Sequence, residues 1–360
     1  MDICLNKPLV PDLKRLTEYL AQVNSSGWYT NFGPLHQQLT AHLEEYLGVE
    51  NLLLVSNGTL ALQVAYKALG VTNALTTPFS FVATTSSLLW QGIDTSFCDI
   101  DRSSYNLCPK ETSNALAANP DINGIVATHV FGNPCDLDAF STIAAEKDVK
   151  VIYDAAHAFG VKVGNESVLN FGDASILSFH ATKVFHSVEG GAIVFKHKAD
   201  FERAKRLINF GIDENGNITE AGINAKLNEY QCAVGLTILD QIDSVIKYRA
   251  ELFGAYRDGL KGYVELPIWH EMANFNGAYM PINLHSEMNV QKVMKALNDS
   301  NIQCRRYFSP SLEQVFTDQI NHGTTNSINI SSGILCLPLH FYMSLSDVDK
   351  VTRTIKQAIL

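Results

Sequence analysis

The sequence has little of what a nucleic-acid-binding or disulfide-bonded protein usually carries. Its 27 basic residues are outnumbered by 37 acidic ones, which gives a formal net charge of −10 at pH 7. A chain with this balance lacks the basic face on which sequence-independent nucleic-acid binding usually depends. The seven cysteines are scattered and none forms a C-x-x-C pair, so we expect no disulfide scaffold and a reducing compartment.

Long apolar runs are also missing. No apolar stretch approaches the roughly 20 residues that a membrane-spanning helix requires. The first residues include Asp2, Lys7 and Asp12, and these charges interrupt the apolar core that a signal peptide needs. We find no internal repeat and no low-complexity linker. We therefore expect a cytoplasmic protein that binds neither membrane nor nucleic acid.

The first part of the chain shows a regular alternation of strand and helix patterns. With 360 residues, the chain is long enough for a large α/β unit and a second, smaller domain. Repeated strand–helix–strand units predict a mostly parallel sheet that is covered on both faces. The predicted strands lie at 52–55, 74–77, 93–97, 124–130, 150–153, 174–179 and 192–195, and the predicted helices at 60–69 and 136–148.

The pattern changes after about residue 197. Helical patterns follow one another closely, and strand patterns become sparse. We predict helices at 200–209, 229–240, 241–260, 288–298 and 346–360, with strands at 278–284 and 302–307. We therefore divide the chain into a large domain, residues 1–240, and a connector helix with a small α+β domain, residues 241–360.

Candidate site residues follow the predicted strands, because open parallel sheets bind ligands at the carboxyl ends of their strands. Ser56-Asn57-Gly58-Thr59 lies between a strand and a helix, where unpaired amides and a hydroxyl can hold a phosphate. The segment is neither a Walker loop nor a G-x-G-x-x-G fingerprint. The alternative for this segment is an ordinary helix N-cap.

Three further side chains lie where they could bind a cofactor or act in catalysis. Asp154 directly follows a strand, where a carboxylate can hold a protonated ring nitrogen, although it could equally cap a helix. Lys183 follows another strand and precedes two glycines; in a cleft it could form a Schiff base, whereas most loop lysines are solvated surface charges. Phe81 could stack on a flat cofactor, while we expect Phe79 to belong to the core. Together these groups match the needs of pyridoxal phosphate.

The sequence resembles the DegT/DnrJ/EryC1/StrS family of nucleotide-sugar aminotransferases over nearly its whole length. The resemblance is carried by the segments 27–34, 56–62, 154–160, 178–191 and 222–235, and most specifically by the spacing from Ser178 through Lys183 to Glu189-Gly190-Gly191. It implies an α/β structure of the aspartate-aminotransferase type (the type I fold of pyridoxal-phosphate enzymes). It also implies pyridoxal 5′-phosphate as cofactor, no metal, and a homodimer with shared active sites.

The resemblance also implies roles for individual residues. Lys183 would form the Schiff base with the cofactor, Asp154 would pair with its ring nitrogen, and these two would be the catalytic residues. The remaining implied cofactor contacts are His157 near the phenolic oxygen, Phe81 on the ring face, Gly58, Thr59 and Ser178 on the phosphate, and Asn224 on the phosphate of the opposite subunit.

The chain departs from the family pattern in places. Lys226 stands where the family has arginine, Val188 stands where glycine is frequent, and the segment 306–312 lacks the family's histidine. Lys183 is retained, whereas dehydratase relatives carry histidine at that position.

By resemblance, the reaction would move an amino group from L-glutamate to a nucleotide-linked keto-deoxysugar. Our first choice of acceptor is dTDP-4-keto-6-deoxy-D-glucose, which would become dTDP-4-amino-4,6-dideoxy-D-glucose for O-antigen or another surface polysaccharide. A C3-aminotransferase acting on a dTDP-3-keto-6-deoxyhexose would use the same machinery. A dehydratase is disfavoured by Lys183, and a nicotinamide-dependent dehydrogenase by the missing glycine fingerprint. The alternative from another class is a non-catalytic regulatory protein on the same fold.

Overall fold

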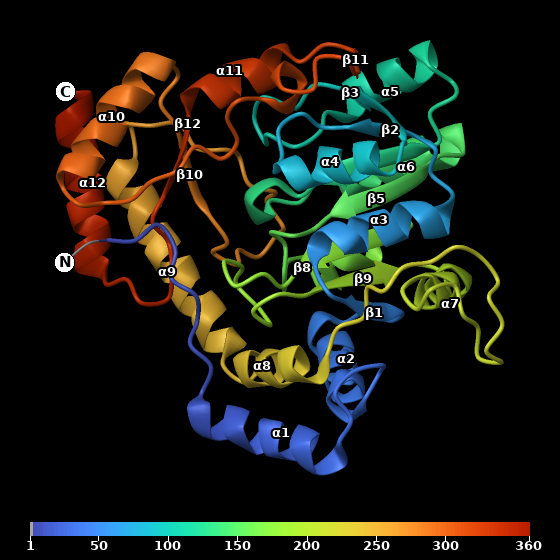
Figure 1. Cartoon of the computed structure of the whole chain (residues 1–360). Coiled ribbons are helices and arrows are strands. Elements are labelled where there is room, and N and C mark those ends of the chain that lie inside the picture. Colours follow the sequence, from blue (N-terminus) through green and yellow to red (C-terminus); the bar gives the residue numbers. More distant parts are fainter. Residues whose placement is uncertain (1–2) are drawn as a thin grey trace.

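The structure is a computed structural model that describes residues 3–360 (Figure 1). The helices are α1 (Leu13–Ser26), α2 (Pro34–Leu47), α3 (Gly58–Leu69), α4 (Val82–Trp90), α5 (Pro109–Ala118), α6 (Leu137–Lys147), α7 (Lys198–Leu207), α8 (Glu229–Leu239), α9 (Ile242–Leu260), α10 (Glu287–Asp299), α11 (Thr325–Gly333) and α12 (Leu345–Ile359). The strands are β1 (Leu52–Val55), β2 (Asn73–Thr76), β3 (Asp94–Phe97), β4 (Gly124–Thr128), β5 (Lys150–Asp154), β6 (Lys162–Val163), β7 (Glu166–Ser167), β8 (Ala174–Ser178), β9 (Gly191–Phe195), β10 (Met280–Asn283), β11 (Ile320–Asn321) and β12 (Ile334–Leu337).

An eight-stranded sheet forms the centre of the large domain, in the order β1-β9-β8-β5-β4-β2-β3-β11. The six neighbouring strands β8, β5, β4, β2, β3 and β11 are all parallel to one another. Strand β9 runs antiparallel to both of its neighbours, β8 and β1. The expected mostly parallel sheet is therefore confirmed. Its edge strand β11 comes from residues 320–321, which the predicted division had given to the small domain.

Both faces of the sheet are buried along β1, β4, β5, β8 and β9, which explains why these strands are mostly apolar. In β1, Leu52 and Leu54 belong to the core cluster shared with α2, α6 and α8. Leu53 and Val55 point to the opposite face, into the cluster shared with α3, α4 and α7. This burial holds the strands rigidly, so that the residues at their carboxyl ends are placed on a fixed platform.

The small domain has its own apolar core. The antiparallel pair β10 and β12 packs with α9, α10 and α12, and Ile3 joins this core from the N-terminal segment. Helix α9 runs from the large domain to the small one (Figure 1). The boundary predicted at residue 240 falls in the short connection between α8 and α9.

The strand predicted at 302–307 is wrong. This segment makes only isolated bridges, one between Ile302 and Ile3 and one between Arg305 and Cys336. Because its two neighbours meet it at single residues, no continuous ladder forms. The pairing partner of β10 is instead β12, which the sequence pattern did not reveal.

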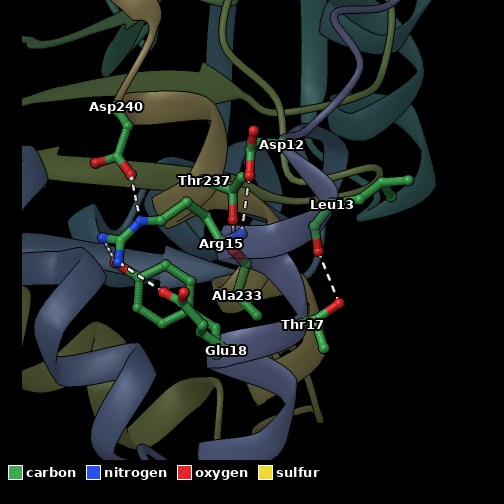
Figure 2. A network of polar contacts seen from close by, with 9 residues as sticks. Asp12, Leu13, Arg15, Thr17, Glu18, Ala233, Thr237 and Asp240 are labelled. Atoms are coloured by element: carbon green, nitrogen blue, oxygen red, sulfur yellow. Dashed lines mark hydrogen bonds and ion pairs between the residues drawn. The ribbon is translucent and has the colours of Figure 1, made fainter.

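Helix α1 is fastened to α8 by a polar network (Figure 2). The Asp12 carboxylate accepts the Arg15 backbone N–H at 2.9 Å and caps the helix. The Arg15 guanidinium then contacts Glu18 at 3.0 Å and Asp240, just beyond α8, at 3.5 Å. Across residues 3–360, no helix has the length and apolar content needed to cross a membrane.

Candidate active site

A cavity of about 310 Å³ lies at the carboxyl ends of β4, β5 and β8 and is closed on one side by the small domain. The structure brings nearly all predicted site residues to its walls. These are Gly58, Thr59, Phe81, Asp154, His157, Ser178 and Lys183. Asn224 is the exception, because it is exposed, does not line the cavity, and bridges through its backbone to Asn209.

One end of the cavity is formed by the N-terminus of α3. The Asn57 side chain accepts the Leu60 N–H at 2.8 Å, so the segment does contain the ordinary N-cap that we considered as the alternative. Gly58 begins the helix, and a Cβ on it would lie 3.0 Å from the Ser178 Cβ. The missing side chain therefore lets the helix amides and the Ser178 hydroxyl approach one another, and the positive end of the helix favours an anion there.

Asp154 forms the floor of the cavity. It is buried, with 6% of its surface exposed, and accepts hydrogen bonds from the Thr84 hydroxyl at 2.7 Å and the Ala156 N–H at 3.1 Å. Burial raises the pKa of this carboxyl, whereas the two hydrogen bonds and the nearby Lys183 oppose that rise. Residues directly after Asp154 form turns, so the alternative of a helix cap does not apply.

His157 presents one ring nitrogen to the cavity. Its Nδ1 accepts the Phe131 N–H at 3.2 Å, and its ring lies 4.6 Å from the ring of Tyr279, centroid to centroid. Burial lowers the pKa of His157 well below its usual value, and the nearby Lys183 side chain lowers it further. The imidazole is therefore neutral with its proton on Nε2, which can donate to an oxygen in the cavity.

Lys183 lies in the loop between β8 and β9, and it is not a solvated surface lysine. Its Nζ is 5.9 Å from the ring centroid of Tyr279, inside the cavity. Burial lowers the pKa of the amine, while Asp154 partly restores it. A lysine with a lowered pKa supplies the unprotonated amine that attacks a carbonyl carbon.

Close packing explains the glycine at position 191, and backbone conformation distinguishes position 188. A Cβ on Gly191 would lie 2.8 Å from the backbone carbon of Asn57, so what passes close to this glycine is the turn before α3. Val188 has φ of 70°, in the left-handed region that a β-branched residue rarely adopts. This backbone conformation is a physical reason for glycine to be frequent at the position in the resembled family.

The two phenylalanines at the start of α4 differ as expected. Phe79 is fully buried and packs edge-on against Phe131 and Phe308, so it belongs to the core. Phe81 is 49% exposed at the wall of the cavity, where its ring is available to a flat ligand. Stacking of Phe81 on a cofactor ring remains a prediction.

Several cavity residues were not identified from the sequence. Tyr279, Arg305, Tyr307 and Phe308 reach the cavity from the small domain, and the Arg305 guanidinium lies 4.8 Å over the Tyr307 ring. The only signal for them was the family-like segment 306–312, which contains two of the four. Thr84 gave no signal, because a buried threonine in an apolar helix is ordinary core.

Replacing Thr84 with valine tests the hydrogen bond to Asp154 while keeping the shape of the buried side chain. Since that bond lowers the pKa of the carboxyl, its loss raises the pKa and leaves less of the carboxylate ionised. We expect kcat to fall about tenfold and the acid limb of the pH–rate profile to move to higher pH. Thr84→Ser keeps the hydroxyl and serves as control; a valine variant with the wild-type pH profile would contradict the assignment.

The residues present fit pyridoxal phosphate. The α3 N-terminus and Ser178 suit the phosphate, Asp154 suits the ring nitrogen, and Lys183 suits the aldehyde, all within one cavity. In the part of the chain that the structure describes, no group of three or more His, Cys, Asp or Glu side chains is arranged to hold a metal ion.

Comparisons with known proteins agree with this chemistry. The DegT/DnrJ/EryC1/StrS aminotransferase family matches residues 12–356. The chain is 39% identical to the dTDP-4-amino-4,6-dideoxy-D-glucose transaminase of Shigella dysenteriae, over 99% of this chain and 98% of that protein. It is 33% identical to the transaminase of the same name from Escherichia coli, over 98% and 97%. The solved structure of DesI with its TDP-sugar product superposes with a TM-score of 0.93 at 29% identity, covering 99% of this chain and 93% of that one.

Proposed function

The chain belongs to the DegT/DnrJ/EryC1/StrS aminotransferase family, and we propose that it transfers an amino group from L-glutamate to C4 of dTDP-4-keto-6-deoxy-D-glucose. It is a pyridoxal-phosphate-dependent sugar aminotransferase with the type I fold. The choice of C4 and of the dTDP-linked acceptor is supported by the names of the two relatives that it matches over nearly its whole length. The product would be dTDP-4-amino-4,6-dideoxy-D-glucose, a precursor for O-antigen or another surface polysaccharide.

The observation that carries the proposal is that buried Asp154 and half-buried Lys183 line one cavity beside the N-terminus of α3. A non-catalytic protein of the same fold would gain nothing from withdrawing an amine and a carboxylate from bulk water, because burying charged groups is costly. The two side chains are therefore best explained as working parts of the reaction.

Each side chain has a defined task. Pyridoxal phosphate, when bound, supplies the conjugated ring that accepts the electron pair released from the donor's α-carbon. Lys183 would hold its aldehyde carbon, and the lysine amine, once freed, would move the proton from the donor's α-carbon to that carbon of the cofactor. Asp154 would keep the ring nitrogen protonated, and Nε2 of His157 would donate to the phenolic oxygen.

The remaining contacts anchor the cofactor. The amides of Gly58 and Thr59 and the hydroxyl of Ser178 would hold the phosphate at the helix N-terminus. Phe81 would cover one face of the ring. These contacts would fix the ring, so that Lys183 would deliver and remove the proton on one side only.

A second copy of the chain completes the site in this proposal. Asn224 is exposed and lies outside the cavity of its own chain, which leaves it available to the cofactor phosphate of a partner subunit. Apolar side chains beside it are also exposed, Ile223 by 41% and Phe210 by 51%, as expected for a surface that a partner covers.

We also propose a cytoplasmic location, which the unpaired state of the cysteines supports.

The substrate assignment is tested by incubating the purified chain with dTDP-4-keto-6-deoxy-D-glucose, L-glutamate and pyridoxal phosphate. We expect NMR of the product to place the new amino group at C4 and to show 2-oxoglutarate in equal amount. The Lys183→Ala variant and a reaction without glutamate are the controls. Absence of reaction with this sugar, together with amination of a dTDP-3-keto-6-deoxyhexose at C3, would overturn the proposal in favour of a C3-aminotransferase.

A further inference from the structure

The N-terminal segment of residues 3–12, which we call the strap, crosses from the small domain to the loop that carries Lys183. We propose that the strap positions Lys183 for proton transfer, through Asn6 on the strap and His186 on the loop. The proposal rests on the role of Lys183 given above. Asn6 and His186 are positioning residues in this account, because neither lines the cavity.

The strap is bound first to the small domain. Ile3 donates its N–H to the backbone of residue 301 at 3.0 Å and accepts the N–H of residue 303 at 2.9 Å. The Val10 N–H donates to the Tyr342 hydroxyl at 2.8 Å, and the Lys7 ammonium lies 4.8 Å over the same ring. These contacts lie at both ends of the strap, so its course over the small domain is fixed.

The strap is also bound to the lysine loop. The Asn6 amide donates through Nδ2 to the Thr182 carbonyl at 2.5 Å, and Thr182 directly precedes Lys183. Three residues further along, the carbonyl of buried Leu9 accepts a hydrogen bond from Nε2 of His186 at 2.8 Å. The loop is therefore held on both sides of Lys183 by the same segment.

His186 can make its contacts in one form only. Its Nδ1 accepts the Val188 N–H at 3.3 Å while its Nε2 donates to Leu9, so the ring must be neutral with its proton on Nε2. Its side chain is buried, with 3% of the residue exposed. A ring that is both buried and bonded at each nitrogen cannot rotate without breaking a bond, and it transmits the position of the strap to the loop.

The strap connects the two halves of the cavity. Lys183 comes from the large domain, whereas Arg305 and Tyr307 come from the small domain, two and four residues beyond residue 303, whose N–H Ile3 accepts. At its other end the strap leads into α1, which is fastened to α8 (Figure 2). The strap is thus a physical link that sets the distance between the lysine and the small-domain wall.

We test the proposal with Asn6→Ala and His186→Phe in the full-length holoenzyme. A misplacement of a catalytic group by about 1 Å can cost a hundredfold in rate, and loss of one of two loop contacts is expected to lower kcat about tenfold with the KM for glutamate unchanged within about twofold. The midpoint of the pH titration of the visible absorption band should also shift, because this band reports the surroundings of Lys183. His186→Gln keeps a donor near the position of Nε2 and should recover most of the activity.

Matched controls separate positioning from folding. Asn114→Ala removes an asparagine whose side chain bonds only within α5, at 3.2 Å to Glu111, and should change neither kcat nor the titration midpoint. Hydrogen exchange of residues 180–188 in the cofactor-free chain should be faster in the Asn6 and His186 variants than in the control. Wild-type kcat, titration midpoint and exchange in both variants would overturn the proposal. Failure of the proposed function gives a different result, because the wild-type chain itself would then take up no cofactor. That result would overturn both the proposed function and the positioning role of the strap.

Discussion

Replacing Lys183 with alanine is expected to abolish transamination, with kcat reduced by about 10⁴-fold or more. Lys183 is the only lysine that lines the cavity within residues 3–360, so no second amine stands ready to replace it. Burial lowers the pKa of its amine, which favours the unprotonated form that takes a proton from the donor. The visible absorption band that follows cofactor uptake should disappear in the variant.

The fold should survive this change. The loop is held by backbone hydrogen bonds that the substitution leaves in place, including Ala181 N–H to Val188 at 2.8 Å and Ser187 N–H to Phe179 at 3.0 Å. Thermal unfolding followed by circular dichroism should give a wild-type transition. Lys147→Ala, at the end of α6 and far from the cavity, is the control and should keep full activity. Measurable turnover by the Lys183 variant would refute the lysine assignment.

Replacing Asp154 with asparagine is expected to lower kcat about a thousandfold, which corresponds to about 4 kcal/mol of transition-state stabilisation. Asparagine has nearly the same shape and can still accept the Ala156 N–H, so the substitution removes the charge and little else. In a buried site the loss of one charge has a large effect, because water does not screen it. Without an anion at this place the ring nitrogen of the cofactor is no longer kept protonated.

The Asp154→Asn variant should also change the pH dependence of cofactor uptake. Asp154 raises the pKa of Lys183, so its neutralisation should lower the pKa of that amine further. The pH profile for the rate of cofactor uptake should therefore move to lower pH in Asp154→Asn. Asp121→Asn, in an exposed turn, is the control. A kcat within tenfold of wild type would contradict the role that we assign to Asp154.

Much of the site could be predicted because parallel sheets gather the residues that follow their strands. Asp154 and Lys183 each come soon after a short apolar run, and Gly58 follows a third. The strands are buried on both faces, so their ends lie at fixed positions on one edge and these residues meet. Local sequence and sheet geometry were sufficient for these three residues, whereas His157 and Ser178 in the same half of the cavity were implied by the family resemblance.

The other half depends on contacts that no local pattern describes. Tyr279 and Arg305 reach the cavity only after the small domain has packed against the large one, and Thr84 is selected by a single hydrogen bond to Asp154. The error at 302–307 has the same origin, because that segment meets its two neighbours only at single residues and β12 pairs with β10 instead. The predicted role of Asn224 depends on a second copy of the chain and stays a prediction.

The central claim is that Lys183 holds the cofactor, and one measurement tests it most directly. The wild-type chain is incubated with pyridoxal phosphate, reduced with borohydride, digested and examined by mass spectrometry. We expect a yellow protein before reduction and a single phosphopyridoxyl group on the peptide that contains Lys183. A label on another lysine, or a colourless protein that carries no label, would contradict the account.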